Sequence, residues 1–180
     1  MERLQEQYNK EFAPKIASEF GYKNTMRVPK ITKVVINVGV GKVKEDKKKI
    51  DDIVIDITKI AGQLPIRTIA RKSIAGFKVR ENQVVGVTTT LRGERMYAFL
   101  DKLINVALPR VKDFHGVSPK GCDGRGNYHL GLKEHIVFPE ISNEALDHIF
   151  GMEVSIVTNA GEDKSARALL TLMKFPFKKE

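Results

Sequence analysis

The sequence predicts a single α+β domain, residues 1–180, in which a mainly antiparallel sheet has helices on one face and long protruding loops. Segments with strand periodicity alternate with segments of helical periodicity. The connections between them vary in length, which favours an antiparallel sheet over a doubly wound parallel one. The strands have one apolar and one polar side, so the other face of the sheet should stay open. A chain of 180 residues that is 42% hydrophobic is long enough for one sizeable core.

The clearest strand pattern runs from residue 31 to residue 40. Even positions such as Val34 and Ile36 are apolar, whereas odd positions include Lys33 and Asn37. Further strands are expected at 64–71, 85–92, 128–135 and 152–159. The strand 85–92 places three polar side chains on its second face, namely Thr88, Thr90 and Arg92.

Helical spacing of apolar residues predicts most of the remaining elements. We expect helices at 2–20, 46–61, 94–108, 143–150 and 165–174. Pro14 should bend or interrupt the first, Gly62 should cap the second and Pro109 should end the third. Two long loops remain, at about 72–82 and 109–127.

The charge of the chain indicates a polyanionic partner. The formal net charge is +9, and residues 65–95 contain seven basic and only two acidic side chains. Nucleic acid is the first candidate for such a charge and an anionic membrane the second. The first residues lack the apolar run of a signal peptide and no stretch is long enough to span a membrane, so we expect a cytoplasmic protein.

The sequence contains no recognisable motif for catalysis, cofactor binding or metal binding. Gly39-Val40-Gly41-Lys42 resembles a phosphate loop, but the preceding glycine and the following serine or threonine are missing. Cys122 is the only cysteine, and the histidines near it, His115, His129 and His135, lack the spacing of a catalytic or metal site. We therefore expect no enzyme activity, no cofactor and no metal.

If the first three strands pair, several polar and basic side chains could share one sheet face. That surface would offer charge for phosphates and amide, hydroxyl and guanidinium groups for sugars and base edges, as folded RNA requires. The alternative is that these are ordinary solvated positions of an amphipathic sheet. The residues are Lys33, Asn37, Arg67, Arg71, Thr88, Thr90 and Arg92.

The loop at 72–82 favours the RNA interpretation. It combines cations with a flexible glycine and an aromatic ring, so it could grip a backbone while the ring stacks or wedges. Alternatively, the charges are merely solvated and the ring anchors the loop to its own core. The residues are Lys72, Ser73, Gly76, Phe77, Lys78 and Arg80.

Several segments resemble one known family. The segment 57–73, built around Ala61-Gly62-Gln63, closely resembles the signature of the large-subunit ribosomal protein five family. The resemblance extends to residues 31–41, 74–80, 92–96 and 138–141 and covers essentially the whole chain.

This resemblance implies a structural protein that binds 5S ribosomal RNA and helps attach it in the central protuberance, beside large-subunit RNA and neighbouring proteins. The 5S contacts it implies are Lys33, Asn37, Gln63, Thr88, Thr90 and Arg92. The loop 72–82 would approach transfer RNA in the peptidyl site. A bridge to a small-subunit protein would involve 110–120 and 134–153, and in particular Arg110, Lys112 and His115.

Alternatives stay open at this point. Asn37 could bond to its own backbone at a sheet edge, and Gln63 could cap the preceding helix. The whole chain could instead be a basic module that binds another protein. Binding that weakens steeply with salt and selects folded RNA over an acidic peptide would exclude this alternative. A phosphate-processing enzyme would need an acidic cluster for magnesium, which the sequence does not provide.

Overall fold

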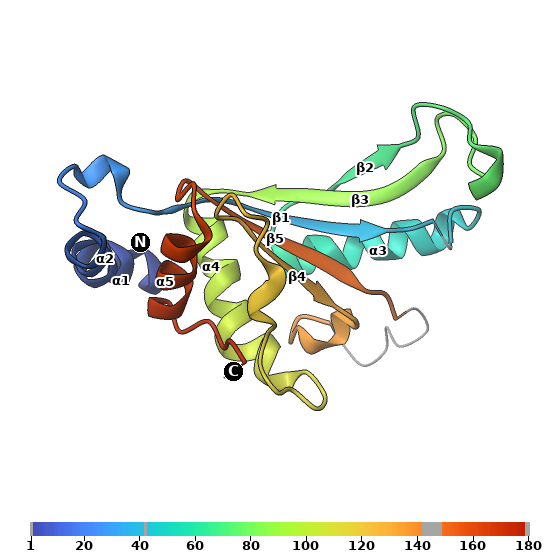
Figure 1. The fold of residues 1–180 in the computed structure, drawn as a ribbon. Helices are drawn as coiled ribbons and strands as arrows, with labels where there is room; N and C mark the ends of the chain where they lie inside the picture. Colours follow the sequence, from blue (N-terminus) through green and yellow to red (C-terminus); the bar gives the residue numbers. More distant parts are fainter. Residues whose placement is uncertain (1, 42, 142–148, 179–180) are drawn as a thin grey trace.

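A computed structural model of the chain describes residues 2–41, 43–141 and 149–178. Five strands form one antiparallel sheet in the spatial order β2-β3-β1-β5-β4 (Figure 1). The strands are β1 (Ile31–Gly39), β2 (Ile66–Ile69), β3 (Val84–Leu91), β4 (Tyr128–Leu132) and β5 (Met152–Thr158). The α-helices are α1 (Arg3–Gln7), α2 (Ala13–Phe20), α3 (Lys47–Ala61), α4 (Gly93–Lys102) and α5 (Asp163–Leu172).

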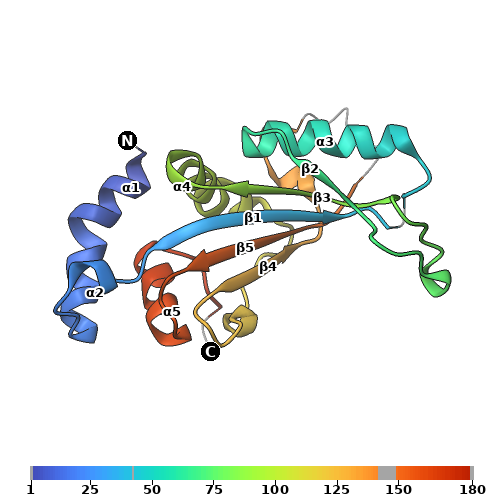
Figure 2. The ribbon, with the colours of Figure 1, turned by 90° about the horizontal axis from the view of Figure 1, so that it is seen from above.

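Helices α3 and α4 lie on one face of the sheet, and the opposite face is open (Figure 1). Helices α1 and α2 lie beyond one end of the sheet, near α5 (Figure 2). At the other end, the β2–β3 hairpin extends past the remaining strands into a long loop. The predicted α+β class, with an antiparallel sheet and helices on one face, is confirmed.

Local sequence explains where α3 begins and ends. The Asp46 side chain accepts a hydrogen bond from the Lys49 N–H at 3.3 Å, which caps the first turn. Gly62 follows the last turn with a φ of 64°, and its N–H donates to the Thr58 carbonyl at 2.9 Å. Because that backbone conformation favours glycine, Gly62 ends the helix as the sequence predicts.

The N-terminal helix runs past Pro14 instead of ending there. Residues Tyr8–Phe12 form a π-helical turn, and the Ala13 N–H donates to the Tyr8 carbonyl. Pro14 is the second residue of α2 and follows this turn directly, and a proline has no N–H to donate to the preceding turn. The expected interruption is therefore a local widening of the helix.

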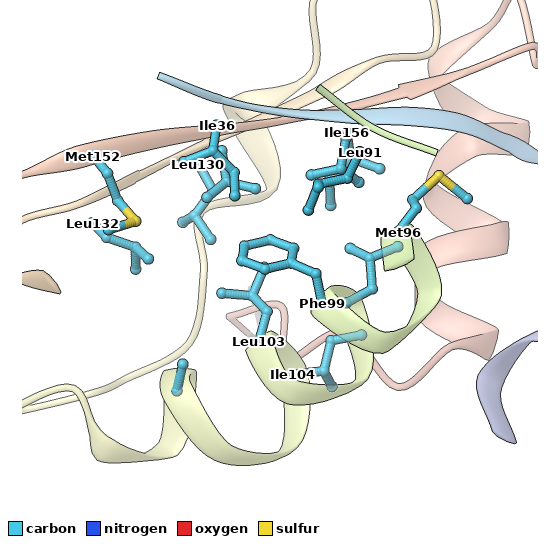
Figure 3. Packing of buried hydrophobic residues seen from close by; sticks show 14 of the residues in the cluster. Ile36, Leu91, Met96, Phe99, Leu103, Ile104, Leu130, Leu132, Met152 and Ile156 are labelled. Carbon is cyan, nitrogen blue, oxygen red and sulfur yellow. The ribbon is translucent and has the colours of Figure 1, made fainter. Parts of the chain in front are cut away.

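The main core lies between the sheet and α4 (Figure 3). Ile36, Leu91 and Ile156 project from three adjacent strands towards Phe99 and the other apolar side chains of α4. All of these are buried, and each side chain of this size contributes about 1.5–3 kcal/mol when removed from water. The same helix continues as a π-helical turn, Leu103–Ala107, and a 3₁₀ turn, Leu108–Arg110, so it ends near Pro109 as expected.

Three elements differ from expectation or lie outside the described chain. Strand β2 covers only four of the eight residues expected. β4 ends at Leu132, so His135 lies in a 3₁₀ turn, His135–Val137. The helix expected at 143–150 falls mostly on residues outside those the structure describes.

His135 is a fully buried titratable group at the edge of the core. Its ring stacks on Phe150 with centroids 3.9 Å apart, and Nδ1 accepts a hydrogen bond from the Phe150 N–H at 3.4 Å. Nε2 lies 3.7 Å from the Asp56 carboxylate, which itself lies 3.8 Å from the Lys59 ammonium. Burial lowers the pKa of His135, and Asp56 only partly opposes this.

We expect the stability of the protein to fall when the pH is lowered below about 6.5. Because the folded-state pKa of His135 is depressed, the unfolded chain binds more protons in this range. The stabilisation is complete above the unfolded pKa and is lost as the pH falls towards the folded pKa. His135→Gln should therefore show a shallower loss of unfolding free energy between pH 7 and 5, measured by urea denaturation. His115→Gln, at an exposed histidine, is the matched control and should keep the steeper loss. Equal slopes in both variants would contradict this account.

Candidate nucleic-acid interface

Strand pairing places the predicted polar side chains of β1 and β3 on the open face. Asn37 lies opposite Thr88, and Val35 lies opposite Thr90. Since directly paired residues point to the same face, Thr88 and Thr90 project on the side of Asn37, away from the buried Ile36. Lys33 continues the same alternation along β1. The structure thus brings four of the six predicted 5S-contact residues onto one surface.

Asn37 and Thr88 differ in whether their side chains already form hydrogen bonds within the protein. The Thr88 hydroxyl donates to the Ile36 carbonyl across the strand pair at 3.1 Å. The Asn37 side chain is exposed, and no hydrogen bond holds it within the described part of the chain. Its amide is therefore available as both a donor and an acceptor for a ligand.

Gln63 connects the end of α3 to the sheet. Its Nε2 donates to the Thr90 carbonyl and its Oε1 accepts from Arg95, both at 3.3 Å. The helix end is closed by Gly62 instead, so the alternative role of Gln63 as a helix cap is wrong. Arg92 is exposed and follows β3 directly, two residues beyond Thr90. Gln63 and Arg92 therefore lie at the margin of the surface formed by β1 and β3.

Arg67 does not lie on the open face, which corrects the sequence prediction. It pairs with Val87, a buried core residue, so its side chain lies on the helix side of the sheet. There it forms an ion pair with Asp51 of α3 at 2.5 Å. Ile66, which pairs with Thr88, takes the corresponding place on the open face and is 71% exposed. The pairing register of β2 decides on which face of the sheet Arg67 lies, and periodicity in so short a strand does not determine that register.

The loop between β2 and β3 is held by its own hydrogen bonds. Ile74 and Val79 exchange backbone bonds at 2.9 and 3.2 Å across a 3₁₀ turn, Ala75–Phe77. The Ser73 hydroxyl accepts from the Glu81 N–H, so this residue orders the loop itself. Phe77 is 74% exposed, which excludes the alternative that its ring anchors the loop in the core. The remaining predicted contact residues, Lys72, Gly76, Lys78 and Arg80, are exposed as well.

Lys44 is a loop contact that sequence reasoning missed. It lies between β1 and α3, and its ammonium donates to the carbonyls of Phe77 and Lys78 at 2.5 and 2.6 Å. Lys78 itself has a φ of 50°, an unusual backbone conformation for a non-glycine residue. Lys44 therefore fixes the tip of the loop relative to the body of the protein.

The three predicted bridge residues lie elsewhere. Arg110, Lys112 and His115 are exposed on the segment that follows the α4 helix, away from the open sheet face (Figure 1). This segment is tied to the C-terminal region, because the Val117 N–H donates to the Pro176 carbonyl at 2.8 Å. The structure therefore separates the bridge candidates from the 5S candidates.

The described residues hold neither a metal cluster nor a membrane-spanning helix. They contain no group of three or more histidine, cysteine, aspartate or glutamate side chains that could hold a metal ion. None of the helices in residues 2–41, 43–141 and 149–178 is long and apolar enough to cross a membrane.

Comparison with known proteins identifies the family. The model for ribosomal protein L5 matches residues 24–80, and the model for the C-terminus of the same ribosomal family matches residues 84–177. The chain belongs to the ribosomal L5 family. Members are structural constituents of the large ribosomal subunit rather than enzymes, and they act in the ribosome in the cytoplasm.

Individual L5 relatives match along the full chain. The large ribosomal subunit protein uL5 of Thermoanaerobacter sp. (strain X514) is 56% identical over 179 residues, which is 99% of this chain and 100% of the relative. The proteins of the same name from Halothermothrix orenii and Bordetella petrii are 55% and 54% identical, each covering 98–99% of this chain and 99% of the relative. The predicted family is confirmed.

Replacing the lysine that holds the loop should loosen the loop without changing the sheet. We expect Lys44→Met to speed amide exchange of residues 74–79 roughly fivefold, as expected for the loss of about 1 kcal/mol of hydrogen bonding. Hydrogen exchange followed by mass spectrometry would measure this. Lys47→Met, at an exposed lysine of α3, is the control. Unchanged exchange in the Lys44 variant would show that the ammonium does not hold the loop.

Proposed function

We propose that this large-subunit constituent binds 5S ribosomal RNA with the open face of its sheet and helps attach that RNA in the central protuberance. The supporting observation is the strand register, which groups Lys33, Asn37, Thr88 and Thr90 on one surface. The free Asn37 amide can fix the position of a sugar or base edge, while the two hydroxyls can contact ribose. Lys33 and Arg92 add charge for phosphates.

The margin of this face adds an apolar component. Leu64 and Ile66 are 70% and 71% exposed beside β3. RNA that covers the open face would remove this area from water and would also cover Asn37 and Gln63. The Asn37 amide has no partner among the described residues, so the RNA must hydrogen-bond it when it is covered. Gln63 already bonds to Thr90 and Arg95 and can accept or donate one further bond to the RNA.

Asn37→Ala combined with Gln63→Ala should weaken 5S RNA binding by about 2 to 4 kcal/mol, taking about 1 to 2 for each buried partner left unpaired. Fluorescence anisotropy across a salt series, with a structured RNA of similar size as competitor, would measure the affinity. Wild-type binding should resist the competitor and weaken steeply with salt.

The matched control is Gln7→Ala combined with Asn9→Ala, on the N-terminal helix. Thermal unfolding would establish that both double variants are folded. Unchanged affinity in a folded Asn37/Gln63 variant would remove both residues from the site. Equal wild-type binding to both RNAs would leave the rival function, a basic protein-binding module.

We further propose that the loop 72–82 contacts transfer RNA in the peptidyl site. Its exposed cations Lys72, Lys78 and Arg80 and the exposed ring of Phe77 suit a nucleic-acid backbone and base. Its projection beyond the other strands separates it from the centre of the open face (Figure 2).

Lys78→Ala with Arg80→Ala should leave binding of isolated 5S RNA nearly intact. The same change should weaken binding of transfer RNA to the peptidyl site of whole ribosomes roughly fivefold, through the loss of two exposed charged contacts. Filter binding would measure the two affinities. Lys47→Ala with Lys48→Ala, at the start of α3, is the control pair. An equal loss of 5S affinity would show that the loop belongs to the first site instead.

The segment that contains Arg110, Lys112 and His115 would contribute to a bridge with a small-subunit protein. Its position away from the open face supports this division. A protein contact there would leave the RNA-binding face unobstructed.

A further inference from the structure

Strand β4 is an edge strand with a partly unpaired outer side. It is last in the order β2-β3-β1-β5-β4 and pairs on one side with β5, from Tyr128 opposite Ile156 to Leu132 opposite Met152. Unpaired edges present backbone donors and acceptors to other chains. The outer side of β4 therefore offers a place for another strand.

Neighbouring atoms identify which backbone groups of β4 point outward. The Leu132 carbonyl points towards Gly151, on the β5 side, because a Cβ built on Gly151 would lie 3.0 Å from it. The His129 carbonyl points the other way, because a Cβ built on Gly121 would lie 2.6 Å from it. Since these directions alternate along a strand, the N–H and carbonyl of Gly131 point outward with those of His129.

The chain itself covers only the beginning of this edge. Cys122 pairs with Tyr128, and a turn held by Asp123 brings the two together. The Asn127 amide and the Arg125 N–H hold the pKa of Asp123 at about 2, so the carboxylate stays ionised. Before Cys122 the chain forms a 3₁₀ turn, Pro119–Gly121, and no strand among the described residues pairs with the outer side of Gly131.

A groove follows the uncovered part of β4. Its volume is about 640 Å³, and it lies between the segment after α4 and residues 128–137. Apolar side chains contribute to its walls, including Leu108, Phe114, Leu132 and Val137. Pockets of this size with apolar walls and a few polar groups are typical binding sites.

The rim of the groove is predominantly basic. Arg110, Lys112, Lys133 and Lys178 are exposed there, against Asp113 and Glu134. A segment with acidic residues would be attracted to this rim. The period of two in a strand would direct alternate side chains of such a segment towards the groove and towards the rim.

We propose that the free edge of β4 and the groove beside it bind an extended acidic and apolar segment of a partner protein, which adds to the sheet as a sixth strand. The backbone of Gly131 would pair with the added strand, the groove would take its apolar side chains, and the basic rim would contact its carboxylates. This proposal makes the bridge part of the proposed function more specific. It rests on that proposed function, because the bridge is the reason for taking the partner to be a protein.

The test uses the full chain and a fluorescein-labelled eight-residue peptide that alternates glutamate with valine. Fluorescence anisotropy should show binding, and the same peptide with lysine for glutamate should bind at least fivefold more weakly at low salt. Gly131→Pro removes the outward N–H without removing a bond to β5 and should weaken binding about tenfold. Gly131→Ala keeps the N–H, and nothing lies within 4 Å of its Cβ, so it is the matched control.

A second variant keeps the test decisive if the proline change unfolds the protein. Lys112→Glu should weaken binding of the acidic peptide and strengthen binding of the basic one. Amide exchange at Gly131 should slow in wild-type protein when the acidic peptide is added. Absence of peptide binding, or equal binding by the proline and alanine variants in folded form, would overturn the proposal.

Subunit association distinguishes a failure of the proposed bridge from a failure of the proposed strand addition. Light scattering would measure subunit association for ribosomes with Arg110, Lys112 and His115 all changed to alanine, and for ribosomes with Gly131→Pro. Weaker association in the triple variant alone would support the bridge and overturn strand addition there. Normal association in both, with the acidic peptide still bound at Gly131, would support the edge site and overturn the bridge.

Discussion

β1 lies at the centre of the sheet and pairs with a strand along each of its edges. Its alternate residues Val34, Ile36 and Val38 are buried against the helices, and a shift by one residue would turn all three towards water. Burial of these side chains therefore fixes which residues of β1 face outward. The position of Asn37 beside Thr88 is a consequence of the core, although neither side chain belongs to it.

The strand order places the three candidate contact surfaces apart. The open face is centred on β1 and β3, the loop projects from the β2–β3 hairpin, and the groove lies beside β4 at the other edge. Five of the seven basic residues between 65 and 95 lie in β2 and in the loop that joins it to β3. A single sheet would thus hold the proposed RNA contacts and the proposed protein contact in fixed relative positions.

Periodicity was sufficient to predict much of this molecule. It predicted which residues of β1 are buried and where helix α3 ends, because β1 and α3 are long and regularly amphipathic. It could not give the pairing of β2, which has four residues and a register shift after Thr68, and so it placed Arg67 on the wrong face. It also could not find the two acceptors of Lys44, since both are backbone carbonyls more than 30 residues away. The bonds of Gln63 to β3 and α4 likewise depend on tertiary structure.

The hydrogen bonds within the β2–β3 loop determine when its conformational entropy is lost. Fixing the backbone of one residue costs about 1–2 kcal/mol, and a disordered loop would incur that cost on meeting its ligand. Here the Ile74–Val79 bonds, the Ser73 hydroxyl and the Lys44 ammonium impose order during folding. A nucleic acid that contacts this loop meets a backbone that is already ordered, so little of its binding energy is consumed in arranging the loop backbone.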